Sequence, residues 1–325
     1  LFKKMKVAGE PIPMVTAYDY TSAKILEEAD IPLVLVGDSL GQVVLGYETT
    51  VSVTMDDILH HAKAVIRGTQ KIHVVADMPF MSYSTPSQAL GNAARLISEG
   101  GAHVVKIEGG SELSEVVNLL SQHGIPVCSH LGLTPQSIHK IGGLGVQAAT
   151  DKTAKELEKD AISLQEAGAS CLVLECIPSL VAERVTKLLE IPVIGIGAGS
   201  KCDGQVLVLY DILGLTSKQP KFSKNFLSGE DSISGAIKKY VKLAEKYNIQ
   251  AQEVDDLLAN KEINIILNLT TPQAHYEIIK KTLLAGKHSY CEKPLSTNYE
   301  HGSELLQLAN DNNLYIGNAP DTFLG

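Results

Sequence analysis

Short runs rich in Val, Ile and Leu recur along the first two-thirds of the chain, and a helix-like stretch follows each run. Apolar runs of this kind are typical of parallel strands buried on both faces, and their alternation with helices is typical of βα repeats. Eight such units in succession favour a closed (β/α)8 TIM barrel over an open sheet. The predicted strands are Met14–Ala17, Leu33–Val36, His73–Ala76, His103–Ile107, Pro126–Ser129, Cys171–Leu174, Val193–Ile196 and Gln205–Leu209.

One of the intervening stretches, Lys152–Gly168, has a clear helical pattern. Its apolar residues fall at helical spacing, and Gly168 stands at the position of a C-terminal cap. We therefore expect a helix that packs one apolar face against the sheet.

Composition excludes several classes of function. The chain has 325 residues and a formal net charge of −9, which argues against nucleic acid as a partner, because binding to phosphate backbones depends on clustered Lys and Arg. No apolar run approaches the roughly 20 residues that span a bilayer, so no membrane partner is expected. The five cysteines have no C-x-x-C or zinc-type spacing and fit structural thiols in a reducing, cytoplasmic setting.

Polar residues follow the predicted strands, at the end of a barrel where TIM-barrel enzymes place their chemistry. An acidic or imidazole side chain follows seven of the eight strands: Asp19, Asp38, Asp77, Glu108, His130, Glu175 and Asp211. A single Asp at such a position is most often a helix N-cap or a solvated loop residue. Seven such residues at the same end of a predicted barrel, however, indicate a functional site there.

Asp38, Asp77 and Glu108 end three neighbouring predicted strands, so their carboxylates are expected to converge on one rim. Carboxylates gathered in an apolar mouth raise one another's pKa unless a cation is present. An all-oxygen set of ligands suits a hard divalent ion such as Mg²⁺, which keeps positions open for water and substrate.

Eight segments, in order along the predicted barrel, resemble the ketopantoate hydroxymethyltransferase family. They are Val15–Tyr20, Leu35–Gly41, Ala76–Met81, Val105–Gly110, His130–Gln136, Leu174–Pro178, Gly195–Gly199 and Pro220–Phe226. The resemblance implies an enzyme of pantothenate and coenzyme A synthesis that transfers a hydroxymethyl group from 5,10-methylenetetrahydrofolate to 3-methyl-2-oxobutanoate through a Mg²⁺-stabilised enolate. It also implies assembly into homo-oligomers.

The resemblance assigns roles to individual residues. It implies that Mg²⁺ is held, directly or through water, by Asp38, Asp77 and Glu108. It also implies that the 2-oxo acid is contacted by Ser39, Asp77 and Lys106, and Asp38 is expected to bind the substrate as well. Glu175 is the expected proton acceptor. His130 lies on the same predicted rim, where it either binds the substrate carboxylate or a metal-bound water, or orients a neighbouring group. The residues that bind the folate are not assigned.

The spacing Gly195-x-Gly197-x-Gly199 invites a dinucleotide-binding interpretation. However, it lacks the complete G-x-G-x-x-G pattern and the acidic residue that should follow about 20 positions later. Close backbone packing at the barrel rim is the favoured interpretation.

We divide the chain into a barrel domain, residues 1–246, and a tail, residues 247–325. The tail resembles the nucleotide-binding domain of the glucose-fructose oxidoreductase and inositol dehydrogenase family, with predicted strands Ile263–Asn268, His288–Cys291 and Leu314–Gly317. The glycine-rich loop and the acidic ribose contact of that family are absent. The tail is therefore expected to be an incomplete Rossmann-like fragment.

Three alternatives to this interpretation remain. The barrel could be another Mg²⁺-dependent carbon–carbon lyase or transferase that works without folate. The chain could be a redox or nucleotide-binding fusion in which the barrel is a scaffold, although the missing glycine-rich loop weighs against it. The pairing of barrel and tail could also be an inactive fusion product.

Overall fold

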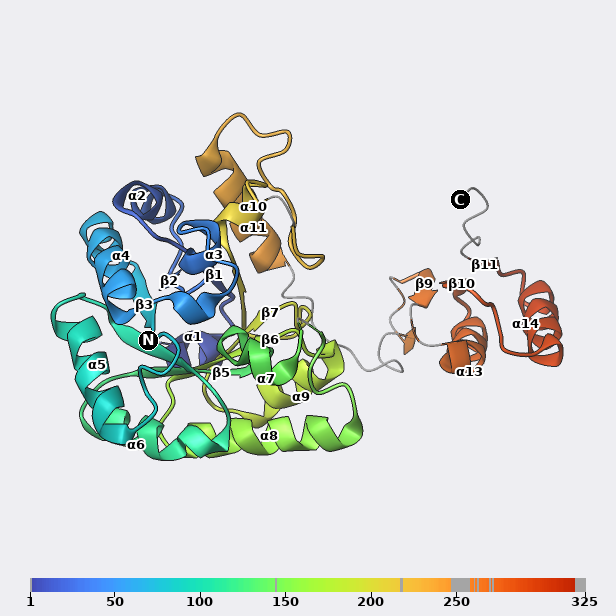
Figure 1. Cartoon of the computed structure of the whole chain (residues 1–325). Coiled ribbons are helices and arrows are strands. Elements are labelled where there is room, and N and C mark those ends of the chain that lie inside the picture. The colour runs from blue at the N-terminus through green and yellow to red at the C-terminus, as the bar shows by residue number, and fades with distance from the viewer. Residues whose placement is uncertain are drawn as a thin grey trace. The chain divides into compact units, whose positions relative to one another are not determined.

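The structure is a computed structural model that describes residues 2–143, 145–216, 219–246, 258–259, 261, 263–268, 270 and 272–318. The chain separates into two compact units, Leu1–Ile249 and Gln250–Gly325, which are drawn in Figure 1. Each unit is described by itself.

The first unit is a closed barrel of eight parallel strands in the order β1 to β8, which confirms the predicted (β/α)8 fold. Hydrogen-bonded pairing of β8 with β1 closes the sheet, so the barrel has no free edge. The strands are β1 (Ile12–Thr16), β2 (Leu33–Val36), β3 (His73–Asp77), β4 (Val104–Glu108), β5 (Val127–Gly132), β6 (Cys171–Glu175), β7 (Val193–Ile196) and β8 (Gly204–Leu207).

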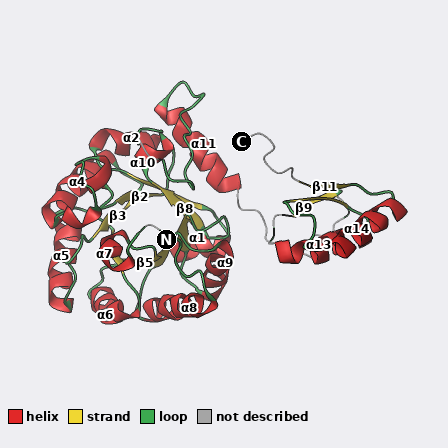
Figure 2. Ribbon diagram, turned by 45° about the vertical axis from the view of Figure 1, so that its right-hand side comes forward, coloured by secondary structure: helices red, strands yellow, loops and turns green. Residues whose placement is uncertain are grey.

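Helices surround the strands (Figure 2). They are α1 (Phe2–Ala8), α2 (Tyr20–Glu28), α3 (Leu40–Val43), α4 (Met55–Gly68), α5 (Pro86–Ser98), α6 (Ser114–Gln122), α7 (Ile138–Ile141), α8 (Asp151–Glu166), α9 (Ser179–Leu188), α10 (Leu209–Ile212) and α11 (Ile233–Lys246). Short 3-10 turns lie at Thr50–Ser52, Ser111–Leu113 and Pro135–Ser137.

The strands are buried on both faces, which explains their nearly continuous apolar sequences. Residues that point outward pack against the surrounding helices in one large cluster. Inward residues such as Met14, Val75 and Cys128 form a second cluster inside the barrel, and Phe2 of α1 joins it. The ring of Phe2 contacts that of His73, the first residue of β3, so α1 lies against the N-terminal end of the barrel.

Most strand boundaries differ slightly from those predicted. β3, β4 and β6 each extend one residue further, to Asp77, Glu108 and Glu175, because the backbone of these polar residues still pairs with the neighbouring strand. Strand β5 continues to Gly132. The predicted helix 152–168 is α8, which ends at Glu166, and Gly168 follows it with a φ of 109° that favours glycine.

The connection from β7 to β8 contains a loop with two glycines of positive φ. A Cβ atom on Gly199 would lie 2.5 Å from the Cβ of Ser179, and one on Gly197 would lie 2.8 Å from the ring of Phe222. The glycines therefore serve close packing at the rim, as the sequence interpretation favoured.

Helix α11 covers the junction between the first and last strands. The Tyr240 hydroxyl lies 3.0 Å from the carbonyl oxygen of Met14 in β1 and 2.9 Å from that of Gln205 in β8. Tyr240 is buried, and its ring packs edge-on against Phe226. The helix is thereby attached to both strands that close the barrel.

The second unit has a three-stranded parallel sheet in the order β11–β10–β9. Its strands are β9 (Ile265–Asn268), β10 (His288–Cys291) and β11 (Ile316–Asn318), close to the predicted ones. Helices α13 (Pro272–Leu284) and α14 (Tyr299–Asp311) lie on the same face of this sheet (Figure 2). In neither unit do the described residues include a helix long and apolar enough to cross a membrane.

Candidate active site

Strand register places charged side chains next to one another at the C-terminal end of the barrel. Asp77 of β3 is the register partner of Lys106 in β4, and Glu108 is the partner of His130 in β5. Register partners in parallel strands face the same side of the sheet. Beneath them, Val75 and Cys128 belong to the inner apolar cluster, so the charged groups form a layer above it.

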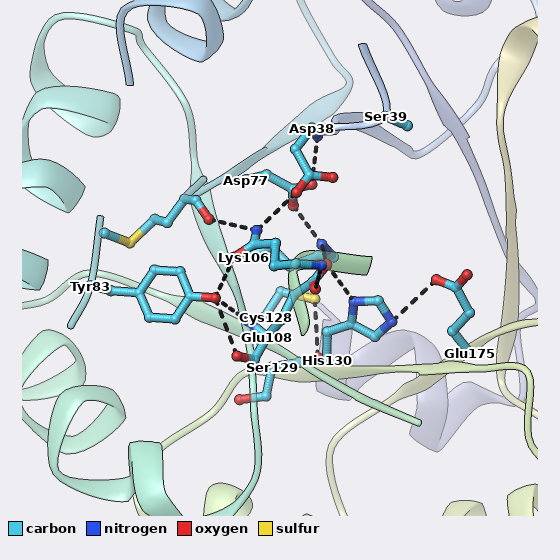
Figure 3. A network of polar contacts seen from close by, with 12 residues as sticks. Asp38, Ser39, Asp77, Tyr83, Lys106, Glu108, Cys128, Ser129, His130 and Glu175 are labelled. Carbon is cyan, nitrogen blue, oxygen red and sulfur yellow. Dashed lines mark hydrogen bonds and ion pairs between the residues drawn. The ribbon is translucent and has the colours of Figure 1, made fainter. Parts of the chain in front are cut away.

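Lys106 is the central cation of this layer (Figure 3). Its Nζ donates a hydrogen bond of 2.7 Å to Asp77 Oδ1 and lies 3.5 Å from Glu108 Oε1, and its side chain is 4% exposed. Burial favours the neutral amine, but the charges of Asp77 and Glu108 outweigh it and raise the pKa of Lys106 well above its usual value. A buried ammonium group of this kind needs its carboxylate partners.

Glu108 and His130 form a second buried pair. His130 Nδ1 lies 3.1 Å from Glu108 Oε1. Although burial opposes ionisation, Lys106 and His130 lower the pKa of Glu108 to about 2. Burial likewise disfavours the imidazolium form, yet Glu108 raises the pKa of His130 to about 9. At neutral pH, His130 is therefore a cation between carboxylates.

Glu175 ends β6 beside His130. Its Oε2 lies 3.3 Å from His130 Nε2, close enough for an ion pair but not aligned for a hydrogen bond. The Glu175 side chain is 15% exposed, compared with 2% for Glu108. Glu175 is thus the carboxylate of this group with access to the open end of the barrel, which a base acting on a bound molecule requires.

Asp38 lies two residues beyond β2 and contacts the same group. Its backbone N–H donates a 2.8 Å hydrogen bond to Asp77 Oδ2, so the two aspartates are adjacent. Burial and then the charges of Asp77 and Glu108 raise the pKa of Asp38 well above its usual value. Within the described parts of the chain, Asp38 forms no salt bridge.

Ser39 follows Asp38 at the rim. Its hydroxyl group lies 2.9 Å from the hydroxyl group of the buried Tyr18, which follows β1. The six residues predicted to bind substrate or act on it, together with Glu108, are therefore gathered from strands β2 to β6 at one end of the barrel: Asp38, Ser39, Asp77, Lys106, His130 and Glu175.

The predicted metal ligands are only partly arranged for a metal. In the described ranges, no group of three or more His, Cys, Asp or Glu side chains could hold an ion as it stands. The ammonium of Lys106 lies within reach of Asp77 and Glu108, and Glu108 is also bound by His130. Asp38 and Asp77 are adjacent acidic residues, and burial, followed by the charges of Asp77 and Glu108, raises the pKa of Asp38 above its usual value. The carboxylate oxygens of Asp38 and Asp77 are donors of the type that Mg²⁺ prefers.

Two other acids that follow strands have different roles. Asp19 is the N-cap of α2, where its carboxylate accepts a hydrogen bond from the backbone of Ser22. Asp211 lies within α10 and accepts a hydrogen bond from Thr216. Asp19 matches the common role of a lone Asp near a strand end, whereas Asp211 is buried within its helix.

Sequence reasoning missed two residues of the site, Tyr83 and Gln136. The Tyr83 hydroxyl lies 2.6 Å from Gln136 Oε1, and Gln136 donates a hydrogen bond to Asp38. Gln136 lies inside one of the segments that resemble the family, but neither residue follows a strand directly. The sequence analysis selected only polar residues that directly follow a predicted strand, so it did not select these two.

Comparison with known proteins places this site in a family. The profile of the family described as ketopantoate hydroxymethyltransferase matches residues 1–248, more than half of the chain. The chain belongs to this family.

Curated ketopantoate hydroxymethyltransferase relatives, each named 3-methyl-2-oxobutanoate hydroxymethyltransferase, support the assignment. The protein from Nitrosococcus oceani is 54% identical over 75% of this chain and 93% of its own length. The one from Syntrophus aciditrophicus is 51% identical over 74% of this chain and 89% of its length. The one from Thermoanaerobacter sp. is 48% identical over 80% of this chain and 96% of its length.

Solved structures outside the ketopantoate hydroxymethyltransferase family share the barrel. A phosphoenolpyruvate phosphomutase from Streptomyces platensis aligns with a TM-score of 0.50 at 13% identity, over 79% of this chain and 94% of its own. A phosphonopyruvate hydrolase in complex with oxalate and Mg²⁺ aligns with a TM-score of 0.50 at 12% identity. The alignment covers 63% of this chain and 78% of the hydrolase chain. At these identities the similarity establishes the fold alone.

A different profile matches the tail. The family described as oxidoreductase, NAD-binding Rossmann fold, matches residues 219–318, which overlap the end of the ketopantoate hydroxymethyltransferase match. The parallel three-stranded sheet with its two helices agrees with the predicted Rossmann-like fragment.

Proposed function

We propose that the barrel transfers a hydroxymethyl group from 5,10-methylenetetrahydrofolate to 3-methyl-2-oxobutanoate and forms 2-dehydropantoate for pantothenate and coenzyme A synthesis. The name shared by relatives that are 48–54% identical supports the acceptor and the group transferred. One observation carries the proposal: a buried group of charged side chains around Lys106 lies at the barrel rim beside the more exposed carboxylate of Glu175.

We propose Asp38 and Asp77 as the residues that hold Mg²⁺, with Glu108 acting through water. Bound there, Mg²⁺ would act as a Lewis acid toward the keto and carboxylate oxygens of the 2-oxo acid. The support is the adjacency of the two aspartates and the oxygen-donor chemistry of their side chains. Glu108 is contacted by two basic side chains, Lys106 and His130, whereas Asp77 is contacted by one, Lys106.

Protein side chains orient the substrate, neutralise its charge and accept its proton. Ser39, Lys106 and His130 supply a hydroxyl and two cations that orient the 2-oxo acid and neutralise negative charge on its keto oxygen. Water supplies an oxygen to the methylene carbon of the donor, both C–N bonds to that carbon break, and tetrahydrofolate leaves. Glu175 accepts the proton from C3 of the acceptor, and the electron pair left on C3 forms the bond to the released one-carbon unit, whose oxygen takes up a proton and becomes the hydroxyl group of the product.

The direct test is an assay of the purified chain for 2-dehydropantoate. Product is expected with both substrates and Mg²⁺, and it should fall to background when a chelator removes the metal or when the folate is omitted. Lack of product under all conditions contradicts the proposed function. Product formed without folate would instead identify a different carbon–carbon lyase or transferase.

That alternative has no specific support, because the barrels of the phosphomutase and the hydrolase are only 12–13% identical to this chain. A cytoplasmic location and a homo-oligomeric state also remain predictions. The five free thiols agree with a reducing compartment.

A further inference from the structure

Gln136 contacts three strand ends at the mouth of the barrel, two through its side chain and one through its backbone N–H. Gln136 lies in the 3-10 turn after β5 and is 4% exposed. Its Nε2 donates hydrogen bonds of 2.9 Å to Asp38 Oδ2 and 3.0 Å to the carbonyl oxygen of Met78. Its backbone N–H donates a 3.0 Å hydrogen bond to Glu108 Oε2.

The surroundings of Gln136 determine which way its amide points. Asp38 in its ionised form and the carbonyl group of Met78 can only accept hydrogen bonds, so they require the NH₂ group. On the other side, the Tyr83 hydroxyl donates to Gln136 Oε1 at 2.6 Å. A reversed amide would place its oxygen against two acceptors, which is costly in a buried position.

This arrangement fixes the carboxylate of Asp38. One oxygen, Oδ2, is held by Gln136, while within the described ranges Oδ1 accepts no hydrogen bond from the protein. The same glutamine residue holds Glu108 through its backbone, although Asp38 follows β2 and Glu108 ends β4, strands that are not neighbours. Gln136 thus sets the relative positions of two carboxylates that the sheet itself does not connect.

We infer that Gln136 is a positioning residue that orients Asp38 and Glu108 for Mg²⁺ and the 2-oxo acid, and that Tyr83 acts through it by fixing the orientation of its amide. This inference rests on the proposed function. It predicts that loss of the amide weakens Mg²⁺ binding without removing any ligand, because groups that hold metal ligands govern how well those ligands are arranged.

The main test compares Gln136→Leu with Gln165→Leu. Gln165 serves as the control because its side chain also makes two hydrogen bonds, accepted by its Oε1 from the backbone N–H groups of Glu190 and Ile191, on the outside of the barrel. Calorimetric titration of each full-length protein with Mg²⁺ alone provides a readout independent of turnover. We expect Gln136→Leu to weaken Mg²⁺ affinity about 10- to 100-fold, and Gln165→Leu to leave it at the parent value.

A second variant, Tyr83→Phe, keeps the inference falsifiable if Gln136→Leu does not fold. It removes one hydroxyl group, and we expect weaker Mg²⁺ binding together with a higher Mg²⁺ requirement for turnover. If folded Gln136→Leu, or Tyr83→Phe, binds Mg²⁺ as the parent does, the inference is overturned while the proposed function stands. A parent protein that neither binds Mg²⁺ nor forms product overturns the proposed function and the inference together.

Discussion

His130 Nε2 lies 3.3 Å from Glu175 Oε2, and this contact connects the proposed base to the buried charges of the barrel mouth. The other ring nitrogen of His130 faces Glu108, which raises the pKa of His130 to about 9. A cationic imidazole group therefore separates a fully buried carboxylate from one that can reach a bound molecule. The first prediction tests this division of roles.

Glu175→Gln should reduce turnover by about 10²- to 10⁴-fold, the usual contribution of a positioned base, because an amide keeps the shape of the side chain but cannot accept the proton. Binding of 3-methyl-2-oxobutanoate, measured by calorimetry, should persist. Glu183→Gln is the control, since Glu183 pairs with Lys187 on α9. Turnover near the parent value in Glu175→Gln would exclude Glu175 as the base.

Asp77→Asn should lose most activity and weaken Mg²⁺ binding while the protein still folds. Asparagine fills the same volume and can still accept a hydrogen bond from Lys106, but it removes a charged ligand. Circular dichroism checks the fold, and rates across a range of Mg²⁺ concentrations check the metal. Asp211→Asn, which changes a buried acid that follows β8, should keep its activity. Full activity of Asp77→Asn at low Mg²⁺ would refute the metal assignment.

The contribution of His103 to the stability of the barrel should be lost as the pH drops below neutrality. Burial, and then the neighbouring His73, lower the pKa of His103, whose Nδ1 accepts a hydrogen bond from the backbone of Val74. The unfolded chain therefore binds a proton more readily than the folded one, so this contribution is present above the unfolded pKa of about 6.5 and is lost as the pH falls. Urea unfolding followed by circular dichroism measures the free energy of unfolding at each pH. Between pH 7.5 and pH 5, this free energy should decrease less in His103→Asn than in the parent. Equal losses in parent and variant would contradict the role of His103.

The tail should confer no nicotinamide-dependent activity. Dinucleotides bind through the backbone N–H groups of a glycine-rich turn at a helix N-terminus, and residues 247–325 contain no G-x-G-x-x-G sequence. Titration with NADH and NADPH, followed by cofactor fluorescence, should therefore detect no binding. Micromolar affinity that disappears when residues 247–325 are deleted would show that the tail binds the cofactor.

The sequence was sufficient to predict the barrel and the layer of charges at its rim. Its apolar runs correspond to strands because parallel strands are buried on both faces, and Asp77, Lys106 and Glu108 converge because strand ends share one rim. Strand ends were less predictable, since a polar residue such as Glu175 keeps its backbone pairing while its side chain serves the site.

Other features depend on the folded path of the loops. Gln136 reaches Asp38 from a turn 98 positions further along the chain, and no spacing rule relates the two. The sequence placed Lys106 in the site but did not show that its ammonium group pairs with Asp77 and Glu108, or that Asp19 caps a helix. Whether an acid at a strand end joins the site depends on its neighbours in space, which the sequence alone does not specify.

The position of Tyr240 has a consequence for how the protein is made. Because its hydroxyl group reaches the carbonyl oxygens of Met14 and Gln205, the two strands that close the barrel acquire their outer cover only after α11 has been synthesised. A chain released from the ribosome before Tyr240 would leave that junction open to solvent and prone to aggregation. Segments added after α11, by contrast, interrupt none of these contacts, so gene rearrangements beyond this point can append new sequence while the barrel still completes its folding.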